Sequence, residues 1–104
     1  MSVLERLTRT IEARRGADPA SSHTAGLLAK GPEKCAEKFG EEAVEAIIEA
    51  VRGDGAALTR ECADVIYHMA VMLAAQDLSL ADVLAELERR EGTSGVAEKA
   101  ARGG

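Results

Sequence analysis

The hydrophobic positions of the chain repeat every three or four residues in five segments, separated by short stretches rich in glycine, serine or proline. This spacing is typical of amphipathic helices, and no run of β-branched residues alternates with polar ones as it would in a strand. The pattern therefore predicts an all-α fold, a small bundle of about five helices. The predicted helices cover about residues 3–15, 23–29, 32–52, 55–75 and 80–91.

The most hydrophobic stretch, residues 61–75, belongs to the fourth predicted helix. All of its residues are apolar except Glu61, Asp64, Tyr67 and His68. On a helix, the two acids and the histidine fall within an arc of about 60°. Because a helix that is apolar almost all round is normally buried, we expect these carboxylates to lie inside the protein. An ionised carboxylate removed from water costs several kcal/mol unless another group compensates it.

The third predicted helix, residues 32–52, carries its charged side chains in one narrow stripe. These lysines and glutamates share an arc of about 100°, and apolar residues cover roughly 220° more. That apolar face is about twice as wide as an ordinary surface helix needs, so we expect this helix also to be packed on most sides. The stripe contains Lys34, Lys38, Glu41, Glu42, Glu45 and Glu49.

The turn at residues 53–55, Gly-Asp-Gly, joins these two helices and makes them antiparallel neighbours. Glu45 and Glu61 each lie eight residues from the first glycine of this turn. Glu42 and Asp64 each lie eleven residues from it. At about 1.5 Å rise per residue, both acidic pairs stand about 12 to 16 Å from the turn, at matching heights. The sequence therefore predicts a central antiparallel hairpin on which the carboxylates of two helices converge.

Clustered carboxylates repel one another, and each raises the pKa of its neighbours unless a cation intervenes. A site of oxygen ligands alone suits Mg²⁺, with Mn²⁺ as a second candidate. Such a site can activate a water and offset charge on a phosphate chain, which is the chemistry of phosphoanhydride hydrolysis. The predicted metal ligands, which are also the predicted catalytic residues, are Glu41, Glu42, Glu45, Glu61 and Asp64.

A solvated face of glutamates paired with nearby lysines is the competing interpretation. For Glu41, Glu42 and Glu45 taken alone we favour that interpretation, whereas the matched stripes on two helices favour a metal site. Lysine placed before glutamate is the weaker order for helical ion pairs, and Glu61 and Asp64 have no such partner in their own segment.

The remaining polar residues have structural or functional interpretations. His68 is equally well explained as a hydrogen-bonded interior histidine or as a substrate contact, and Tyr67 is best explained by packing with a bonded hydroxyl. Lys30, Lys34 and Lys38 can hold phosphates or face solvent. The two cysteines, Cys35 and Cys62, lie in apolar helical segments and are expected to be small buried side chains.

Length and charge set further limits. The 104 residues predict one domain, residues 1–92, followed by a poorly ordered tail at residues 93–104. A net charge of −5 argues against a general nucleic-acid binder, which needs a basic face. With no apparent signal peptide or membrane span, we expect a cytoplasmic protein that does not bind membranes. Five short helices cannot cover two helices that are apolar over most of their circumference, so we expect a homodimer or a higher homo-oligomer.

The acidic motif resembles that of a known enzyme group. Glu41-Glu42-x-x-Glu45 followed by Glu61-x-x-Asp64 is similar to the metal motif of the all-α, MazG-like nucleotide pyrophosphohydrolases. The surrounding segments are more specific. TAGLLAKGPEKCAEKFGEEAVEAIIEA and ECADVIYHMAVMLAAQDLSLADVLAELERR closely resemble the phosphoribosyl-ATP pyrophosphohydrolase family of histidine biosynthesis.

This resemblance implies Mg²⁺-dependent hydrolysis of phosphoribosyl-ATP to phosphoribosyl-AMP and pyrophosphate. It implies that the five acids are metal ligands or support them, and that further residues contact the substrate. Those contacts would be Lys34, Lys38 and His68 on the phosphates, with Thr24 and Lys30 in the same similar segment. The alternatives are a housecleaning pyrophosphohydrolase that acts on other nucleotides and a non-catalytic helical dimerisation module that binds metal structurally.

Overall fold

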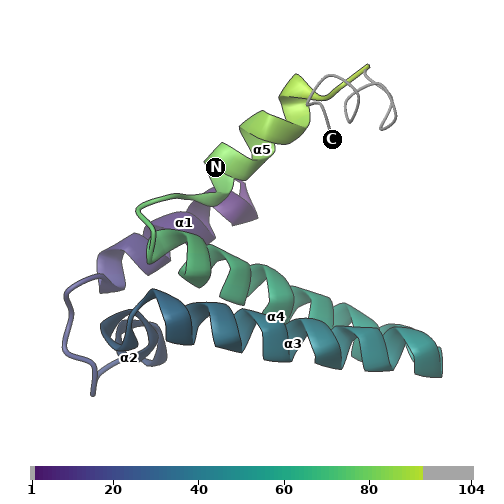
Figure 1. The fold of residues 1–104 in the computed structure, drawn as a ribbon, viewed down its shortest axis with the longest axis horizontal. Coiled ribbons are helices and arrows are strands. Elements are labelled where there is room, and N and C mark those ends of the chain that lie inside the picture. Colours follow the sequence, from purple (N-terminus) through teal and green to yellow (C-terminus); the bar gives the residue numbers. More distant parts are fainter. Residues whose placement is uncertain (1, 93–104) are drawn as a thin grey trace.

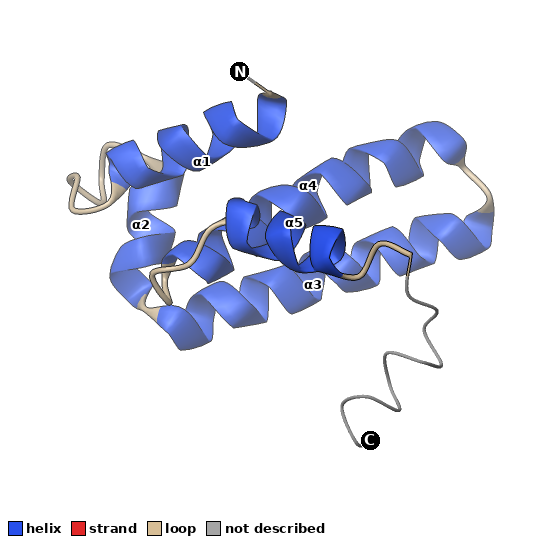
Figure 2. Cartoon of the chain, turned by 90° about the horizontal axis from the view of Figure 1, so that it is seen from above, coloured by secondary structure: helices blue, strands red, loops and turns tan. Residues whose placement is uncertain are grey.

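A computed structural model describes residues 2–92, and within them the chain forms five helices and no strand. Figures 1 and 2 show α3 and α4 side by side as a long antiparallel hairpin. α1 and α2 lie at its open end, and α5 slants away from the hairpin. The all-α fold and the central hairpin predicted from the sequence are confirmed. The helices are α1 (Val3–Arg14), α2 (His23–Lys30), α3 (Pro32–Arg52), α4 (Gly55–Ala74) and α5 (Leu80–Arg89).

Side-chain caps explain where several helices begin. The hydroxyl of Ser22 accepts a hydrogen bond from the backbone N–H of Ala25 at the start of α2, and the carboxylate of Asp54 accepts one from Ala57 at the start of α4. These contacts satisfy backbone donors that have no partner inside the helix. At the other end of α3, Gly53 adopts a φ of 78°, which costs glycine little and turns the chain into α4.

The hydrophobic core lies at the open end of the hairpin. There Ile11 of α1, Leu27 of α2, Cys35 of α3 and Val71 of α4 are almost completely buried, and Leu80 of α5 joins the same cluster. Each helix thus contributes to one core, whereas the end of the hairpin that carries the turn extends beyond it (Figure 1).

The first half of α4 is more exposed than the sequence predicted. Its buried residues, His68, Ala70, Val71 and Ala74, all lie in the second half. Cys62 is exposed, so the prediction of a buried side chain is wrong for this cysteine, while it is confirmed for Cys35. The physical reason is that near the turn α4 packs only against α3, because the other helices cover the opposite end.

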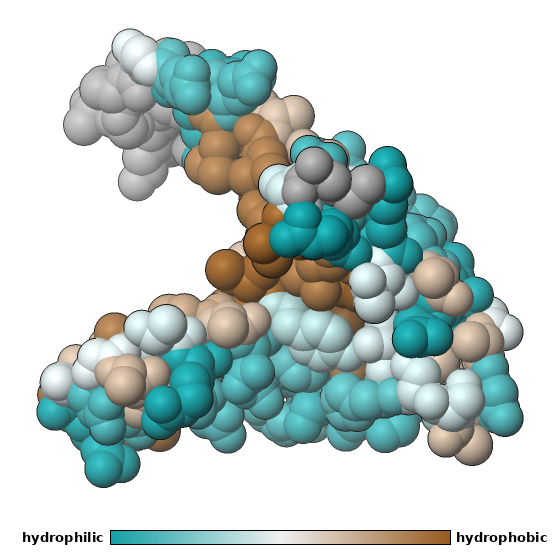
Figure 3. Space-filling view, turned by 180° about the vertical axis from the view of Figure 1, so that it is seen from behind, coloured by the Kyte–Doolittle hydropathy of each residue, from teal (hydrophilic) through white to brown (hydrophobic). Residues whose placement is uncertain are grey.

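Large hydrophobic side chains consequently remain exposed on the hairpin. On α3 only Cys35 is buried, although the sequence predicted packing on most sides. Figure 3 shows a wide notch between α5 and the hairpin, with hydrophobic residues along its inner surface. The exposed hydrophobic residues of α3, α4 and α5 are Val44, Ile47, Ile48, Val51, Ile66, Leu84 and Leu87.

Among residues 2–92, no helix is both long enough and apolar enough to cross a bilayer. The predicted tail at residues 93–104 lies outside the described residues.

Candidate metal centre

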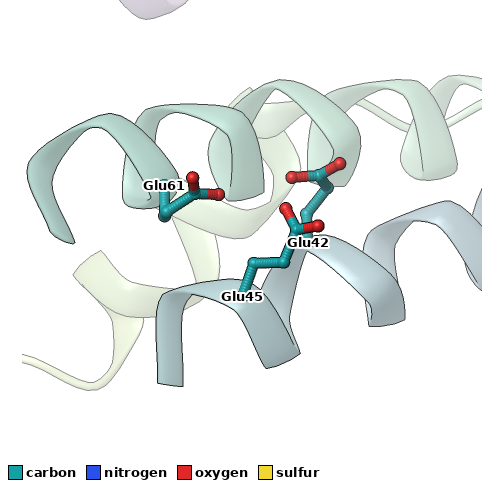
Figure 4. Close-up of side chains that lie close together, drawn as sticks. All are labelled: Glu42, Glu45 and Glu61. Atoms are coloured by element: carbon teal, nitrogen blue, oxygen red, sulfur yellow. The ribbon is translucent and has the colours of Figure 1, made fainter. Parts of the chain in front are cut away.

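Three glutamates from the two hairpin helices form a compact cluster. Glu42 and Glu45 lie one helical turn apart on α3, and Glu61 faces them from α4 (Figure 4). One carboxylate oxygen from each of the three lies within 4.8 Å of the other two. Glu45 and Glu61 are the pair that the sequence placed eight residues on either side of the turn, and the structure brings them together.

The other two predicted ligands lie outside this three-residue cluster. Glu41 is exposed, and its carboxylate lies 2.9 Å from the Nζ atom of Lys38. Asp64 is also exposed, but it is near enough for its charge to raise the pKa of Glu42 and Glu61. A metal-ligand role for Glu41 and Asp64 stays a prediction.

The two lysines of the α3 stripe pair with acids of their own helix outside the cluster. The Nζ atom of Lys34 lies 2.9 Å from the carboxylate of Glu37, and Lys38 makes its contact with Glu41. This is the ion pairing expected of a solvated face, and it applies to the outer part of the stripe. Both lysines remain partly accessible. Lys38 is near enough to the cluster for Glu42 and Glu45 to add to the effect of Glu41, which raises the pKa of Lys38.

The cluster makes ionisation of its own acids unfavourable. Desolvation by burial is the largest cause that raises the pKa of Glu42, and its neighbour Glu45 raises it further. Burial is likewise the first cause that raises the pKa of Glu61, followed by Glu45 and Asp64. The Oε2 atom of Glu61 is buried and has no hydrogen-bond partner within residues 2–92. Without a cation, the folded protein therefore holds protons on these acids more tightly than the unfolded chain does.

These pKa shifts predict how pH affects stability. Because the pKa of Glu61 is raised in the folded state, its protonated form favours folding, and that advantage is lost as the pH rises from about 4.5 through the folded pKa. We expect metal-free Glu61→Gln to melt above the wild type, with a gap in Tm that widens as the pH rises through this window. Burial lowers the pKa of His68, which acts in the opposite direction in both proteins and so cancels in the comparison.

Thermal melts between pH 4 and 8 in a chelator check this prediction, with Glu33→Gln in the exposed first turn of α3 as the control. Saturating Mg²⁺ should raise the Tm of the wild type and narrow or reverse its gap to Glu61→Gln. If the difference in Tm between the two proteins stays constant with pH, the charge of Glu61 does not destabilise the folded protein.

His68 and Tyr67 connect the cluster to α2. His68 is 6 % exposed, and its Nε2 atom lies 3.9 Å from Oε1 of Glu42. Its Nδ1 atom has no hydrogen-bond partner in the described part of the chain. Tyr67 packs edge-on against His68 with ring centroids 4.9 Å apart, and its hydroxyl forms a short hydrogen bond with the hydroxyl of Thr24. The packed tyrosine with a bonded hydroxyl is confirmed. His68 is interior as expected, but its ring forms no hydrogen bond within residues 2–92, and its contact with substrate stays a prediction. Lys30 lies apart from the cluster, at the last residue of α2.

Sequence analysis missed His23, the first residue of α2. Its ring centroid lies 6.3 Å from that of His68 and 6.4 Å from that of Tyr67. The only signal in the sequence was its identity as the first of the chain's two histidines, directly after the capping residue Ser22.

The residues of the cluster fit a divalent cation that prefers oxygen ligands. Three carboxylates from two rigid helices converge, one oxygen is buried with no hydrogen-bond partner among the described residues, and burial together with mutual repulsion raises the pKa of Glu42 and Glu61. A hard cation such as Mg²⁺ would satisfy the unpaired oxygen and remove the repulsion. The arrangement can therefore hold a cation against a phosphate chain.

Comparisons with known proteins agree with this chemistry. A family model described as phosphoribosyl-ATP pyrophosphohydrolase matches residues 4–91. The chain is 78% identical to a phosphoribosyl-ATP pyrophosphatase of Cereibacter sphaeroides, over 99% of this chain and 100% of that protein. It is 76% identical to the protein of the same name from Dinoroseobacter shibae, over 98% and 100% of the two chains. A Rhodobacter capsulatus relative with this name is 72% identical over 99% and 100%.

Proposed function

Because the chain belongs to the phosphoribosyl-ATP pyrophosphohydrolase family, we propose that it hydrolyses phosphoribosyl-ATP to phosphoribosyl-AMP and pyrophosphate, in histidine biosynthesis. The observation that carries this proposal is the cluster of Glu42, Glu45 and Glu61 on the hairpin of a chain with such relatives. In the reaction, water adds to a phosphorus of the triphosphate chain, a phosphoanhydride bond breaks and pyrophosphate leaves.

Mg²⁺ is the cofactor we propose for this site. Glu42, Glu45 and Glu61 would hold it, with Glu41 and Asp64 beside them as further ligands or supporting carboxylates. When bound, the ion would polarise a water or phosphate oxygen and offset negative charge on the leaving pyrophosphate. Mn²⁺ has the same preference for oxygen ligands and could replace it.

The chain's own cations would position the phosphates. Lys34 and Lys38 lie on the same α3 stripe as the acids and can exchange their glutamate partners for phosphate oxygens, at little cost because such exposed pairs are weak. His68, buried beside Glu42, would limit access of water on that side of the cluster. Thr24, bonded to the hydroxyl of Tyr67, would act through that tyrosine. Lys30, at the end of α2, would contact a part of the substrate farther from the carboxylate cluster.

A homodimer is part of this proposal. Exposed hydrophobic side chains follow both hairpin helices and α5, and a single chain leaves them in water. A second copy related by a two-fold axis would bury the same surface on both subunits. The cytoplasmic location inferred from the sequence stays a prediction.

The proposed function is tested by pyrophosphate release from phosphoribosyl-ATP in the presence of Mg²⁺. We expect turnover that a chelator abolishes and added Mg²⁺ restores. Parallel reactions with dUTP, dCTP and ATP separate this function from a housecleaning enzyme, which would prefer one of them. Absence of turnover on all four nucleotides would favour a non-catalytic module and contradict the proposal.

A further inference from the structure

A hollow of about 740 Å³ lies against α2 and the loop that precedes it. His23, Gly26 and Lys30 line it from the helix, and residues 19–22 line it from the loop. Its volume falls within the range of small-molecule sites, about 300 to 1,000 Å³. This hollow is separate from the carboxylate cluster but lies next to the rings that border it.

His23, which lines the hollow, belongs to a group of ring-bearing side chains. The protein has two histidines, one tyrosine, one phenylalanine and no tryptophan. Both histidines and the tyrosine form one group, in which the planes of the exposed His23 ring and the Tyr67 ring lie within 20° of parallel. Aromatic and imidazole rings are the side chains on which nucleobases stack. Of these three residues, His23 lines the hollow, and a base bound there would therefore stack on His23.

Two short distances, through His68, connect His23 to the carboxylate cluster. Glu42 lies 3.9 Å from His68, and the His68 and His23 ring centroids are 6.3 Å apart. In a nucleotide the ribose separates the phosphates from the base by a similar span. Phosphates held at the cluster would therefore place the base near His23.

Gly26 lines the hollow without a side chain. A Cβ atom at this position would lie 3.5 Å from the backbone oxygen of Pro19, which is an ordinary contact, so the surrounding protein does not require glycine. Glycine in the interior of a helix is nevertheless less stable than alanine. A flat ligand lying along α2 between His23 and Lys30 would explain the bare surface.

Building on the proposed function, we propose that this hollow binds the purine base of the nucleotide, with the His23 ring stacked on the base. The positive charge of Lys30 at the other end of α2 suits the phosphate that the phosphoribosyl group adds to the base. This site would thus bind the base and the phosphoribosyl phosphate, which the carboxylate cluster does not contact.

The test separates base binding from phosphate binding. In His23→Ala we expect the KM for phosphoribosyl-ATP and the dissociation constant for AMP to rise about tenfold, the loss typical of one stacked base, with kcat nearly unchanged. Binding of inorganic tripolyphosphate, which has no base, should not change. His23→Phe keeps a ring and should recover most of the affinity, and Gln76→Ala, outside the hollow, should match the wild type.

Gly26→Leu provides an independent variant, because its side chain would fill the hollow and weaken AMP binding without touching the carboxylates. In the wild-type protein, AMP should shift the NMR signals of the His23 ring and tripolyphosphate should leave them in place. This measurement does not depend on the folding of any variant.

The inference would be overturned if His23→Ala bound AMP with unchanged affinity, or if AMP did not shift the NMR signals of the His23 ring. Neither result would contradict the proposed function. Conversely, if the wild type fails to hydrolyse phosphoribosyl-ATP but binds AMP through His23, the proposed function fails and the base site stands.

Discussion

Replacing Glu61 by glutamine is expected to lower kcat for phosphoribosyl-ATP by about a thousandfold while the protein stays folded. Glutamine has nearly the same size and keeps one oxygen, but it removes the negative charge that α4 contributes to the cluster. If that charge holds Mg²⁺ against the phosphates, its loss costs about 4 kcal/mol of transition-state stabilisation, at 1.36 kcal/mol per tenfold change. Steady-state pyrophosphate release at saturating Mg²⁺ measures the effect.

The matched control for this substitution is Glu33→Gln, which removes the same charge from the exposed first turn of α3. It should retain wild-type kcat, so that a loss confined to Glu61→Gln cannot be attributed to net charge. In a chelator, Glu61→Gln should also melt at a higher temperature than the wild type above pH 4.5, because the raised pKa of Glu61 marks an unfavourable charge. Activity within threefold of the wild type would contradict the assignment of Glu61 to the site.

The pairing of Glu45 with Glu61 was predictable because helix geometry is regular. Two helices joined by so short a turn lie antiparallel, and equal distances from Gly53 place the two acids at equal heights. The same count also paired Glu42 with Asp64, yet Asp64 is exposed and lies outside the cluster. Height along a helix follows from residue number, whereas rotation about its axis depends on packing with the other helices, which a count of residues does not contain.

Burial was harder to predict because a hydrophobic pattern does not say which chain will cover it. The apolar circumference of residues 61–75 predicted a buried helix, but the half that carries Cys62 and Ile66 is exposed in a single chain. The position of His23 shows a similar limit, since its neighbours Tyr67 and His68 are more than 40 residues away in sequence. Contacts of this kind depend on how α2 docks on α4, and no local spacing encodes them.

Ile47→Asp is expected to convert the protein from a dimer into a folded monomer. Ile47 is 61 % exposed in the single chain and lies among the other exposed hydrophobic residues of α3, so the substitution removes little packing within one subunit. Across a two-fold interface the same face of both subunits is buried, and the change places a carboxylate in it twice. Burial of unpaired, like charges costs several kcal/mol, so the dimer dissociation constant should rise by more than about 100-fold.

Val3→Asp is the matched control, because Val3 is 67 % exposed on α1, away from the hairpin, and gains the same charge. Sedimentation velocity from nanomolar to micromolar protein should show dimers for the wild type and Val3→Asp, and a 10.9 kDa monomer for Ile47→Asp at the same concentrations. Circular dichroism should show unchanged helix content in both variants. A wild type that sediments as a monomer at micromolar concentration would contradict the dimer, and the exposed face of α3 would then need another partner.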